Sequence, residues 1–261
     1  MLLWLMSMRS IKLTMAYDGT GYAGWQIQSG RKTVQEVLQT ALATITGEAI
    51  RVTASGRTDA GVHALGQVVS FRTRSRLAPE VFRRALNANL PRDVAVLEVA
   101  DAPDGFDASR HAVRKRYRYV IRDGPLRDVF ARHYCWQYGF RLDAAAMHRA
   151  ARPLVGRHDF AGFQTSGSER LSTVRTIYDL SVCRGKGEDR DVVSVEVEAD
   201  GFLYNMVRAI VGTLVEVGRG ARSEAWVEQV LQSKDRRRAG RTAPPHGLFL
   251  VRVEYARNEE G

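Results

Sequence analysis

Residues 54–67 read Ala-Ser-Gly-Arg-Thr-Asp-Ala-Gly-Val-His-Ala-Leu-Gly-Gln and lead into an apolar run at 68–71. A single carboxylate, Asp59, stands between two glycines, and Arg57 lies two residues before it. Glycine lets a backbone approach a ligand closely and adopt conformations closed to other residues. The stretch therefore predicts a loop that presents Asp59 at the entrance of a strand. For the loop by itself an ordinary solvated turn is the alternative, because Asp and Gly are common in turns.

Around this stretch the chain alternates between strand-like and helix-like patterns. Apolar residues alternate with polar ones in segments that we expect to be strands, namely 11–17, 113–122, 192–199 and 248–253. Apolar residues recur at helical spacing in others, namely 34–45, 79–86, 142–155 and 203–217. Thr33 is a candidate N-cap for the first helix, and Gly47 a candidate end. The pattern predicts an α/β fold with antiparallel character.

The composition is that of a globular protein with an anionic partner. The chain has 261 residues, of which 44% are hydrophobic and 26% charged, and its formal net charge is +10. This length suits one large or two small domains, and a balance this basic favours nucleic acid or an anionic membrane. No apolar run reaches the roughly 20 residues that a membrane span needs. Cys135 and Cys183 are far apart, so we expect two buried thiols, a reducing compartment and no metal framework.

The first eight residues are expected to form a disordered extension. Residues 1–6 are apolar, but the run is short and no basic residue precedes it, so a signal peptide is not expected. Met8 is an alternative start to Met1.

Three local patterns suggest other chemistries and are weak. Residues 19–24 fit G-x-G-x-x-G, but Gly30 stops any helix after them, so a nucleotide cofactor is not expected. Asp59 and His63 have a spacing that two metal ligands could share. No third ligand lies near them in sequence, so we expect His63 to pack or cap locally. Ser55 lacks the surroundings of a hydrolase nucleophile.

Two basic segments are candidate RNA contacts. Along residues 114–122 the arginines Arg114, Arg116 and Arg118 fall on one face of the predicted strand, and Tyr117 and Tyr119 on the other. Basic groups for phosphates and an aromatic ring for an extruded base suit RNA, whereas tyrosines in a half-buried strand are often core, as we expect for Tyr119. Residues 234–241 form a second basic run, for which a solvated loop and an RNA contact are equally good interpretations.

Arg208 is the only charged residue between Gly201 and Val215, in the most apolar predicted helix. It lies off the centre of the apolar stripe. Such an arginine either extends its long stem to solvent or pairs with a buried carboxylate. The pattern alone slightly favours an Arg208 side chain that extends to solvent.

The stretch at 54–67 resembles the signature of the TruA-type tRNA pseudouridine synthases. Further segments match that family in order, from about residue 11 to residue 255: Tyr17-Asp18-Gly19-Thr20, Gly24-Trp25-Gln26, Thr33-Val34-Gln35, Asn89-Leu90-Pro91, Phe106-Asp107-Ala108, Arg116-Tyr117-Arg118-Tyr119, His158-Asp159-Phe160, Met206-Val207-Arg208 and Gly247-Leu248. The chain departs from the pattern at Ser109-Arg110-His111, where the family has Arg-Phe.

The resemblance implies a pseudouridine synthase fold of two similar α/β halves that share a mainly antiparallel sheet with a central cleft. The expected halves are 9–108, carrying the Asp59 loop, and 109–261, completing the cleft and the RNA-binding surface. The implied activity converts uridine to pseudouridine in the anticodon stem-loop of tRNA, just 3′ of the anticodon. The base is flipped, no cofactor and no metal are needed, and the enzyme is a cytoplasmic homodimer.

The resemblance also implies roles for single residues. Asp59 is the catalytic group, either as a nucleophile or as a base for a sugar proton, and Arg208 pairs with it. Tyr117 lies against the target base, Arg57 fills the space that the base leaves, and Leu248 contacts the substrate. The expected RNA contacts are Phe106, Asp107, Ala108, Ser109, Arg110, Arg114 and Arg116. Two rivals are a non-catalytic RNA-binding protein with a degenerate site and a nucleotide-dependent oxidoreductase that uses residues 19–24.

Overall fold

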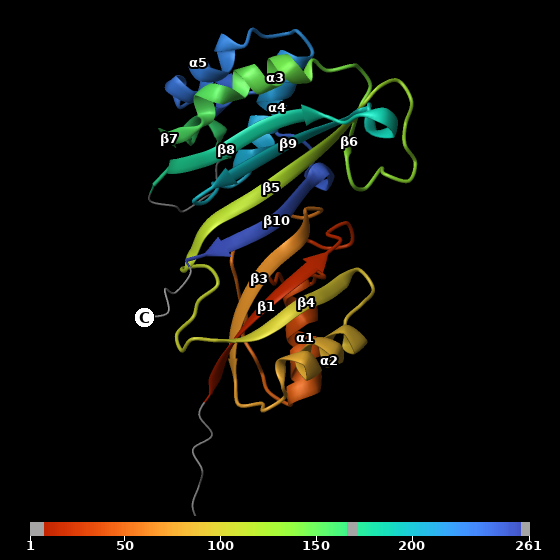
Figure 1. Cartoon of the computed structure of the whole chain (residues 1–261), viewed down its shortest axis with the longest axis vertical. Coiled ribbons are helices and arrows are strands. Elements are labelled where there is room, and N and C mark those ends of the chain that lie inside the picture. The colour runs from red at the N-terminus through yellow and green to blue at the C-terminus, as the bar shows by residue number, and fades with distance from the viewer. Residues whose placement is uncertain (1–7, 166–171, 257–261) are drawn as a thin grey trace, which may run out of the picture. The chain divides into compact units, whose positions relative to one another are not determined.

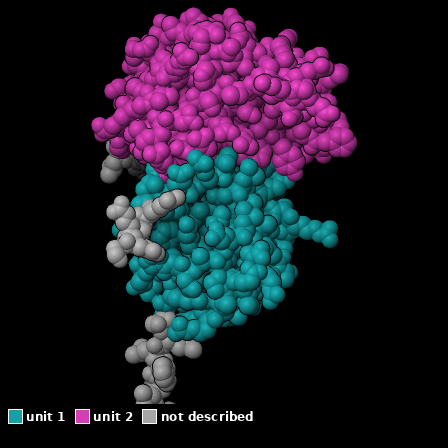
Figure 2. All heavy atoms as spheres, in the orientation of Figure 1, with its two compact units in different colours: residues 1–113, 250–261 teal, residues 114–249 magenta. Residues whose placement is uncertain are grey.

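The computed structural model describes residues 8–165 and 172–256. The chain forms two compact units, residues 1–113 with 250–261 and residues 114–249 (Figure 2). The division thus falls at 113/114, and the end of the last strand belongs to the first unit. The roles expected for the two halves remain predictions, and residues 1–7 of the extension expected at 1–8 lie outside the described residues.

The first unit is an antiparallel sheet with two helices. Its strands are ordered β4-β1-β3-β10, and β2 pairs with β3 (Figure 1). The elements are β1 (Arg9–Tyr17), α1 (Val34–Thr46), β2 (Thr53–Ala54), β3 (His63–Thr73), α2 (Pro79–Asn89), β4 (Val94–Ala102) and β10 (Leu248–Tyr255). β10 lies beside β3 because Gly66 has no side chain: a Cβ there would stand 2.5 Å from the carbonyl oxygen of Val251.

Alternation and capping explain these elements. Along β1 the side chains of Ile11, Leu13 and Met15 are fully buried while the intervening ones are half-buried, as a strand with one core face requires. Thr33 caps α1 by accepting a hydrogen bond from the backbone N–H of Glu36. The helix ends at Gly47, whose φ of 71° is left-handed. Both caps are confirmed as predicted.

The second unit has strands ordered β5-β9-β8-β7, all antiparallel, with β6 parallel to β5. Its helices α3, α4 and α5 gather together (Figure 1). The elements are β5 (Ala112–Asp123), β6 (Trp136–Tyr138), α3 (Ala144–Ala151), β7 (Gly156–Asp159), β8 (Val174–Arg184), β9 (Val192–Ala199), α4 (Met206–Gly218) and α5 (Ala225–Ser233), with short 3-10 turns between several of them. Helix α4 is buried along almost its whole length. The expected α/β fold with a mainly antiparallel sheet is confirmed.

Three expectations need correction. Helix α4 begins at Met206 rather than at Leu203, because Asn205 has a left-handed backbone with φ 60°. Helix α3 gives way to a 3-10 turn after Ala151, where Pro153 removes a backbone donor. Cys135 is buried as expected, but Cys183 is exposed on β8. No helix among the described residues is both long and apolar enough to cross a membrane.

Candidate functional site

A buried network of hydrogen bonds holds the Asp59 loop against the strands next to it. The hydroxyl of Tyr17 lies 2.8 Å from that of Thr58, and Gln67 donates to the carbonyl of Gly56 at 2.8 Å. Ser55 donates to Gln67 at 2.7 Å, so its hydroxyl is engaged in the support of the loop. Burial raises the pKa of Tyr17 to about 12, despite its hydrogen bonds with Thr58 and Gln67. Tyr17 is therefore neutral at pH 7, and its role is to hold the loop through hydrogen bonds rather than to act as a base.

The glycines of residues 19–24 bring a second loop directly against the Asp59 loop. A Cβ on Gly19 would stand 2.1 Å from the carbonyl oxygen of Val62, and one on Gly24 2.7 Å from that of Thr58. Trp25 donates its backbone N–H to the same Thr58 carbonyl at 3.0 Å. Close backbone packing therefore accounts for Gly19 and Gly24 but not for Gly21, where a Cβ would meet nothing within 4 Å, and no helix begins in residues 19–24.

Within this frame Asp59 is half-buried and Arg57 is exposed. His63 is buried at the start of β3, where its Nδ1 lies 3.1 Å from both the Gly19 backbone nitrogen and the Asp18 carboxylate. Nδ1 accepts from the Gly19 N–H when the ring carries its proton on Nε2, and it donates to Asp18 when Nδ1 itself is protonated. His63 thus packs locally, as expected. Among residues 8–165 and 172–256 no group of three or more His, Cys, Asp or Glu side chains could hold a metal ion.

Tyr117 is on the buried face of β5 in the second unit. Its side chain is 8% exposed, and its ring meets that of Phe202 edge-on, with centroids 5.0 Å apart. Tyr119, two residues along the same face, is fully buried and donates to the carbonyl of Pro244 at 2.8 Å. Its core role is confirmed.

Arg208 lies in the first turn of α4 and is held by protein oxygens. Its Nε donates to the carbonyl of Ala243 at 2.7 Å, and its Nη1 to the side-chain oxygen of Asn205 at 2.6 Å. The side chain is half-buried. Extension of a solvated stem into water therefore does not describe this residue.

Leu248 is buried at the first position of β10. The glycine before it, Gly247, lies against the Tyr119 ring, where a Cβ would stand 2.7 Å from a ring carbon. Gly247 thus packs on the same tyrosine whose hydroxyl donates to the carbonyl of Pro244.

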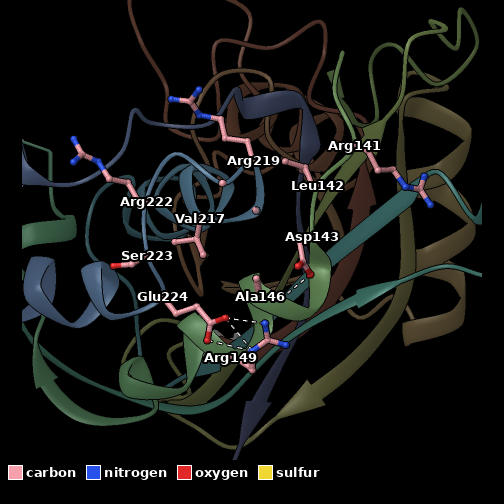
Figure 3. A pocket seen from close by; sticks show the side chains of 12 residues that line it. Arg141, Leu142, Asp143, Ala146, Arg149, Val217, Arg219, Arg222, Ser223 and Glu224 are labelled. Carbon is pink, nitrogen blue, oxygen red and sulfur yellow. Dashed lines mark hydrogen bonds and ion pairs between the residues drawn. The ribbon is translucent and has the colours of Figure 1, made fainter.

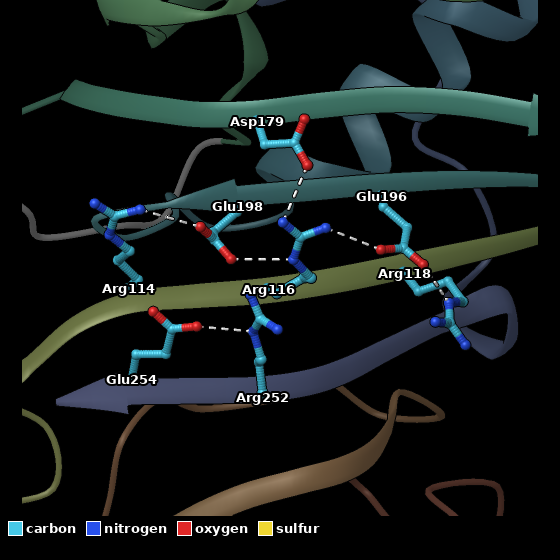
Figure 4. Close-up of polar contacts among 8 residues, drawn as sticks. All are labelled: Arg114, Arg116, Arg118, Asp179, Glu196, Glu198, Arg252 and Glu254. Carbon is cyan, nitrogen blue, oxygen red and sulfur yellow. Dashed lines mark hydrogen bonds and ion pairs between the residues drawn. The ribbon is translucent and has the colours of Figure 1, made fainter.

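The basic face of β5 is paired with carboxylates on its neighbours (Figure 4). Arg116 lies 3.0 Å from each of three carboxylates, and the same register sets Arg118 opposite Glu196. The carboxylates are Asp179 on β8 and Glu196 and Glu198 on β9. Burial by itself would lower the pKa of Arg116, but its hydrogen bonds to Glu198 and Glu196 outweigh burial and raise it. Three arginines facing three carboxylates leave this face far less basic than the sequence of β5 suggests.

Residues 106–110 form an anchored turn in the first unit. The carboxylate of Asp107 accepts from the backbone N–H groups of Ser109 and Arg110 at 2.8 and 2.9 Å. Ala108 is buried and bonded through its main chain to Ser70 and Tyr255, and the Phe106 ring packs on that of Tyr255. Ser109 and Arg110 are exposed and are the members of this set that present side chains to solvent.

The second basic run, 234–241, is anchored at both ends. Lys234 pairs with Asp159 at 3.0 Å, and the Arg241 guanidinium stacks 5.1 Å from the centroid of Trp136. Gly240 packs against the backbone of Gly212 in α4. Its exposed basic residues are Lys234, Arg237, Arg238 and Arg241, so the run still offers basic side chains to a partner although its ends are held.

One cavity of about 670 Å³ lies elsewhere in the second unit (Figure 3). It is lined by four arginines, but Arg149 faces Glu224 at 2.8 Å. Arg141 and Arg219 are also ion-paired, and Arg222 lies over the ring of Trp226. None of the residues predicted for the site lines this cavity, so it is not the site that the sequence predicts.

The two units divide the predicted site residues between them. The first contains Asp59, Arg57 and the turn 106–110, and the second contains Tyr117, Arg208, Leu248, Arg114 and Arg116. The sequence did not reveal the residues that hold these side chains in place. They are Thr58 and Gln67, which hydrogen-bond within the Asp59 loop, Phe202, which packs on Tyr117, and Asn205, which accepts from Arg208. Thr58 and Gln67 stand inside the quoted stretch, and Phe202 and Asn205 close to the Met206-Val207-Arg208 motif, so proximity to a motif was the available signal.

Comparison with known proteins identifies the family of this chain. The family model described as tRNA pseudouridine synthase matches residues 13–109 and 150–256. Proteins named tRNA pseudouridine synthase A from Thermoanaerobacter sp. (strain X514) and Geobacillus sp. (strain WCH70) are 46% and 47% identical over 248 residues. These alignments cover 95% of this chain and 100% and 98% of the relatives. The relative of the same name from Caldicellulosiruptor saccharolyticus is 42% identical over the same share of the chain. The chain therefore belongs to the tRNA pseudouridine synthase family.

Proposed function

We propose that this chain isomerises uridine to pseudouridine in tRNA, at uridines of the anticodon arm just 3′ of the anticodon. Family membership over nearly the whole chain supports the reaction, and the resemblance to the TruA type supports the position. The observation that carries the proposal is the built Asp59 loop: an intact motif on a buried polar support, with its carboxylate half-buried rather than lost in solvent.

The reaction breaks the C1′–N1 bond, rotates the uracil and forms a C1′–C5 bond, while C5 loses its proton and N1 gains one. Product and substrate are isomers, so the chemistry needs no oxidant and no co-substrate. Asp59 supplies the one essential oxygen, either by attack on the nucleotide or by removal of a sugar proton. The resemblance gives Arg208 the role of keeping that carboxylate charged, since a nearby cation favours the ionised form. That role joins residues of two units and stays a prediction, as do those of Arg57, Tyr117 and Leu248.

The net charge of +10 supports an RNA partner, because phosphate contacts supply most of the affinity of such proteins. The exposed arginines of residues 106–110 and 234–241 offer such contacts. Arg114 remains a candidate because it is more exposed than Arg116.

We also propose a cytoplasmic homodimer, as the resemblance implies. The most exposed large apolar side chains of the described residues fall between residues 126 and 140 of the second unit, and exposed apolar surface can mark an interface. Leu126 is 85% exposed and Phe130 87%, with Phe140 close behind them in sequence. This stretch is the surface on which a second copy would dock.

Incubation of the purified chain with unmodified tRNA transcripts, followed by pseudouridine mapping, tests the activity. We expect pseudouridine at anticodon-arm uridines with wild-type protein and none with Asp59→Asn. Asn has the size of Asp but neither a nucleophilic oxygen nor a base at neutral pH. The variant should keep its tRNA affinity to within about tenfold, because affinity comes mainly from many phosphate contacts.

Product formed by Asp59→Asn at the wild-type rate would contradict the mechanism. Tight tRNA binding by the wild type with no product at any uridine would favour the rival, a non-catalytic RNA-binding protein. A shift in product to another arm of the tRNA would leave the reaction intact and overturn the proposed position.

A further inference from the structure

We propose that Asn205 is a positioning residue that fixes the orientation of the Arg208 guanidinium. Asn205 does so together with the main-chain carbonyl of Ala243. The inference deepens the proposed function and rests on it, because it matters to the reaction only if Arg208 does.

Two acceptors on different nitrogens fix the guanidinium plane. Nη1 of Arg208 donates to Oδ1 of Asn205 at 2.6 Å, and Nε donates to the carbonyl of Ala243 at 2.7 Å. A planar group with rigidly placed N–H bonds that makes two such contacts can no longer rotate about its stem. Ala243 is itself tied to the same helix, since its N–H donates to the Arg208 carbonyl at 3.0 Å.

The amide of Asn205 is held from its other end. Its Nδ2 donates to the hydroxyl of Thr165 at 3.2 Å. Because the guanidinium of Arg208 can only donate, the amide must turn its oxygen towards Arg208 and its nitrogen towards Thr165. The chain Thr165–Asn205–Arg208 thus has one consistent direction of donation.

The backbone of Asn205 shows that its side chain is not used for the helix. Asn205 is the N-cap of α4 and has φ 60° and ψ 8°; among the described residues only it and Lys234 combine positive φ with a side chain. An N-cap asparagine usually accepts from the first backbone N–H groups of its helix, but here the side chain makes no capping bond. Glycine and asparagine both adopt this backbone readily, and of the two only asparagine has the amide that contacts Arg208 and Thr165.

The two acceptors of Arg208, Asn205 and the Ala243 carbonyl, form a clamp that offsets an unfavourable electrostatic environment. Arg208 is in the first turn of α4, where the positive end of the helix dipole disfavours a cation. Its helix neighbours Val207 and Ala209 are buried. Oxygens from Asn205 and Ala243 offset this environment and hold the guanidinium in one place, ready for its role.

Asn205→Gly tests the proposal because it keeps the left-handed backbone and removes the amide. We expect an unchanged unfolding temperature, tRNA affinity within about twofold of wild type, and a single-turnover rate at least about tenfold lower, as misplacement of an essential group produces. Asn205→Asp retains an oxygen acceptor and should recover part of the rate. A wild-type rate for Asn205→Gly would mean that Asn205 serves only the backbone, and would overturn the proposal.

A double-mutant cycle with Arg208→Met separates action through Arg208 from action elsewhere. If Asn205 acts through Arg208, Asn205→Gly should lower the rate no further in the Arg208→Met background. A second full loss in that background would also overturn the proposal. Should the wild type make no pseudouridine at all, the clamp can still be judged by NMR of the Arg208 Nε–H. Its signal should be protected from exchange in wild type and lose that protection in Asn205→Gly, whereas equal protection would refute the clamp.

Discussion

At the scale of single residues, Tyr117 shows how a predicted site residue can also serve the core. Its ring packs edge-on against Phe202 and is 8% exposed in the chain by itself. Stacking on a base requires ring surface that this packing partly covers. The two roles therefore lead to different outcomes when the ring is removed.

We predict that Tyr117→Ala weakens tRNA binding by about 1–3 kcal/mol, the usual value of a base–aromatic stack. Tyr117→Phe, which keeps the ring and loses the hydroxyl, should weaken it less. The measurement is tRNA affinity at a temperature where both variants are folded, because loss of a buried ring also costs roughly 3 kcal/mol of stability. Equal affinity for wild type and Tyr117→Ala would assign Tyr117 to the core alone.

At the scale of elements, the register between β5 and β9 decides how much of the basic face is available to RNA. Arg116 stands opposite Glu198 and Arg118 opposite Glu196, and cross-strand pairs of this kind stabilise a sheet. The side chain of Arg116 is 19% exposed and that of Arg114 is 46% exposed. Arg116 is therefore built into the sheet, while Arg114 can turn towards solvent.

We predict that Arg116→Gln lowers the free energy of unfolding by about 2 kcal/mol, since it leaves Glu198 buried with a weaker partner. Arg114→Gln should cost less than about 1 kcal/mol. If Arg114 contacts a phosphate, the slope of log K against log salt should fall by about one for its variant. Urea unfolding and salt-dependent tRNA binding on both variants check this. If Arg116→Gln instead lowered the salt slope of tRNA binding and left the stability unchanged, Arg116 would be the phosphate contact rather than a sheet residue.

A buried ion pair at the end of β5 makes stability depend on pH. Asp123 is 1% exposed and accepts from Arg184 at 2.7 and 2.8 Å and from the backbone N–H of Leu142 at 2.7 Å. Burial alone would raise the pKa of Asp123, but these hydrogen bonds and the charges of Arg184 and Arg141 together lower it below the usual 3.8. A depressed carboxylate pKa stabilises the fold above the unfolded value, and the contribution is lost as pH falls through the folded value.

We predict that Asp123→Asn costs about 3 kcal/mol at pH 7, because it leaves Arg184 without its charge partner. The difference from wild type should shrink as the pH is lowered from about 5 to below the usual carboxylate pKa. Asp191→Asn, which removes the exposed partner of Arg141, is the matched control and should cost less than about 1 kcal/mol. A difference for Asp123 that stays constant across this range would show that the lowered pKa is not what stabilises the pair.

The elements also show where sequence reasoning succeeds. Strands with one buried face, such as β9, and helices with clear caps, such as α1, follow from local periodicity and were predicted. The carboxylates that neutralise β5 were not, because strand register depends on partners distant in the chain. Likewise Gly19 and Gly24 could be rejected as a nucleotide site, but their close approach to the Asp59 loop involves residues about 40 positions away. The Asp59 loop itself was found because glycines, carboxylate and strand entrance are contiguous.

At the scale of the whole molecule, the proposed dimer accounts for apolar surface that neither unit buries. Leu126, Val129 and Phe130 follow the end of β5 within a few residues, and all three are well exposed. Asp128 accepts the backbone N–H groups of Phe130 and Ala131 at 2.9 and 3.0 Å, so this turn has a defined shape. A shaped, apolar turn suits a protein partner better than bulk water.

We predict that wild-type protein at micromolar concentration sediments at twice the chain mass of 29.2 kDa and that Phe130→Glu shifts it to the monomer. A charge placed in the apolar centre of an interface must be desolvated without a partner, which costs several kcal/mol. Leu97→Glu on β4 is the control: it changes a side chain that is also exposed, but in the first unit, and should leave the mass unchanged. Leu97→Glu should keep the wild-type unfolding temperature because its side chain is exposed, whereas Phe130→Glu should lose only the stability that association adds, and its monomer should stay folded. A monomeric wild type, or a Phe130→Glu protein that stays dimeric, would remove this turn from the proposed interface.

If Phe130→Glu is monomeric and still modifies tRNA at the wild-type rate, each chain carries a complete site, and the dimer serves tRNA binding or stability instead.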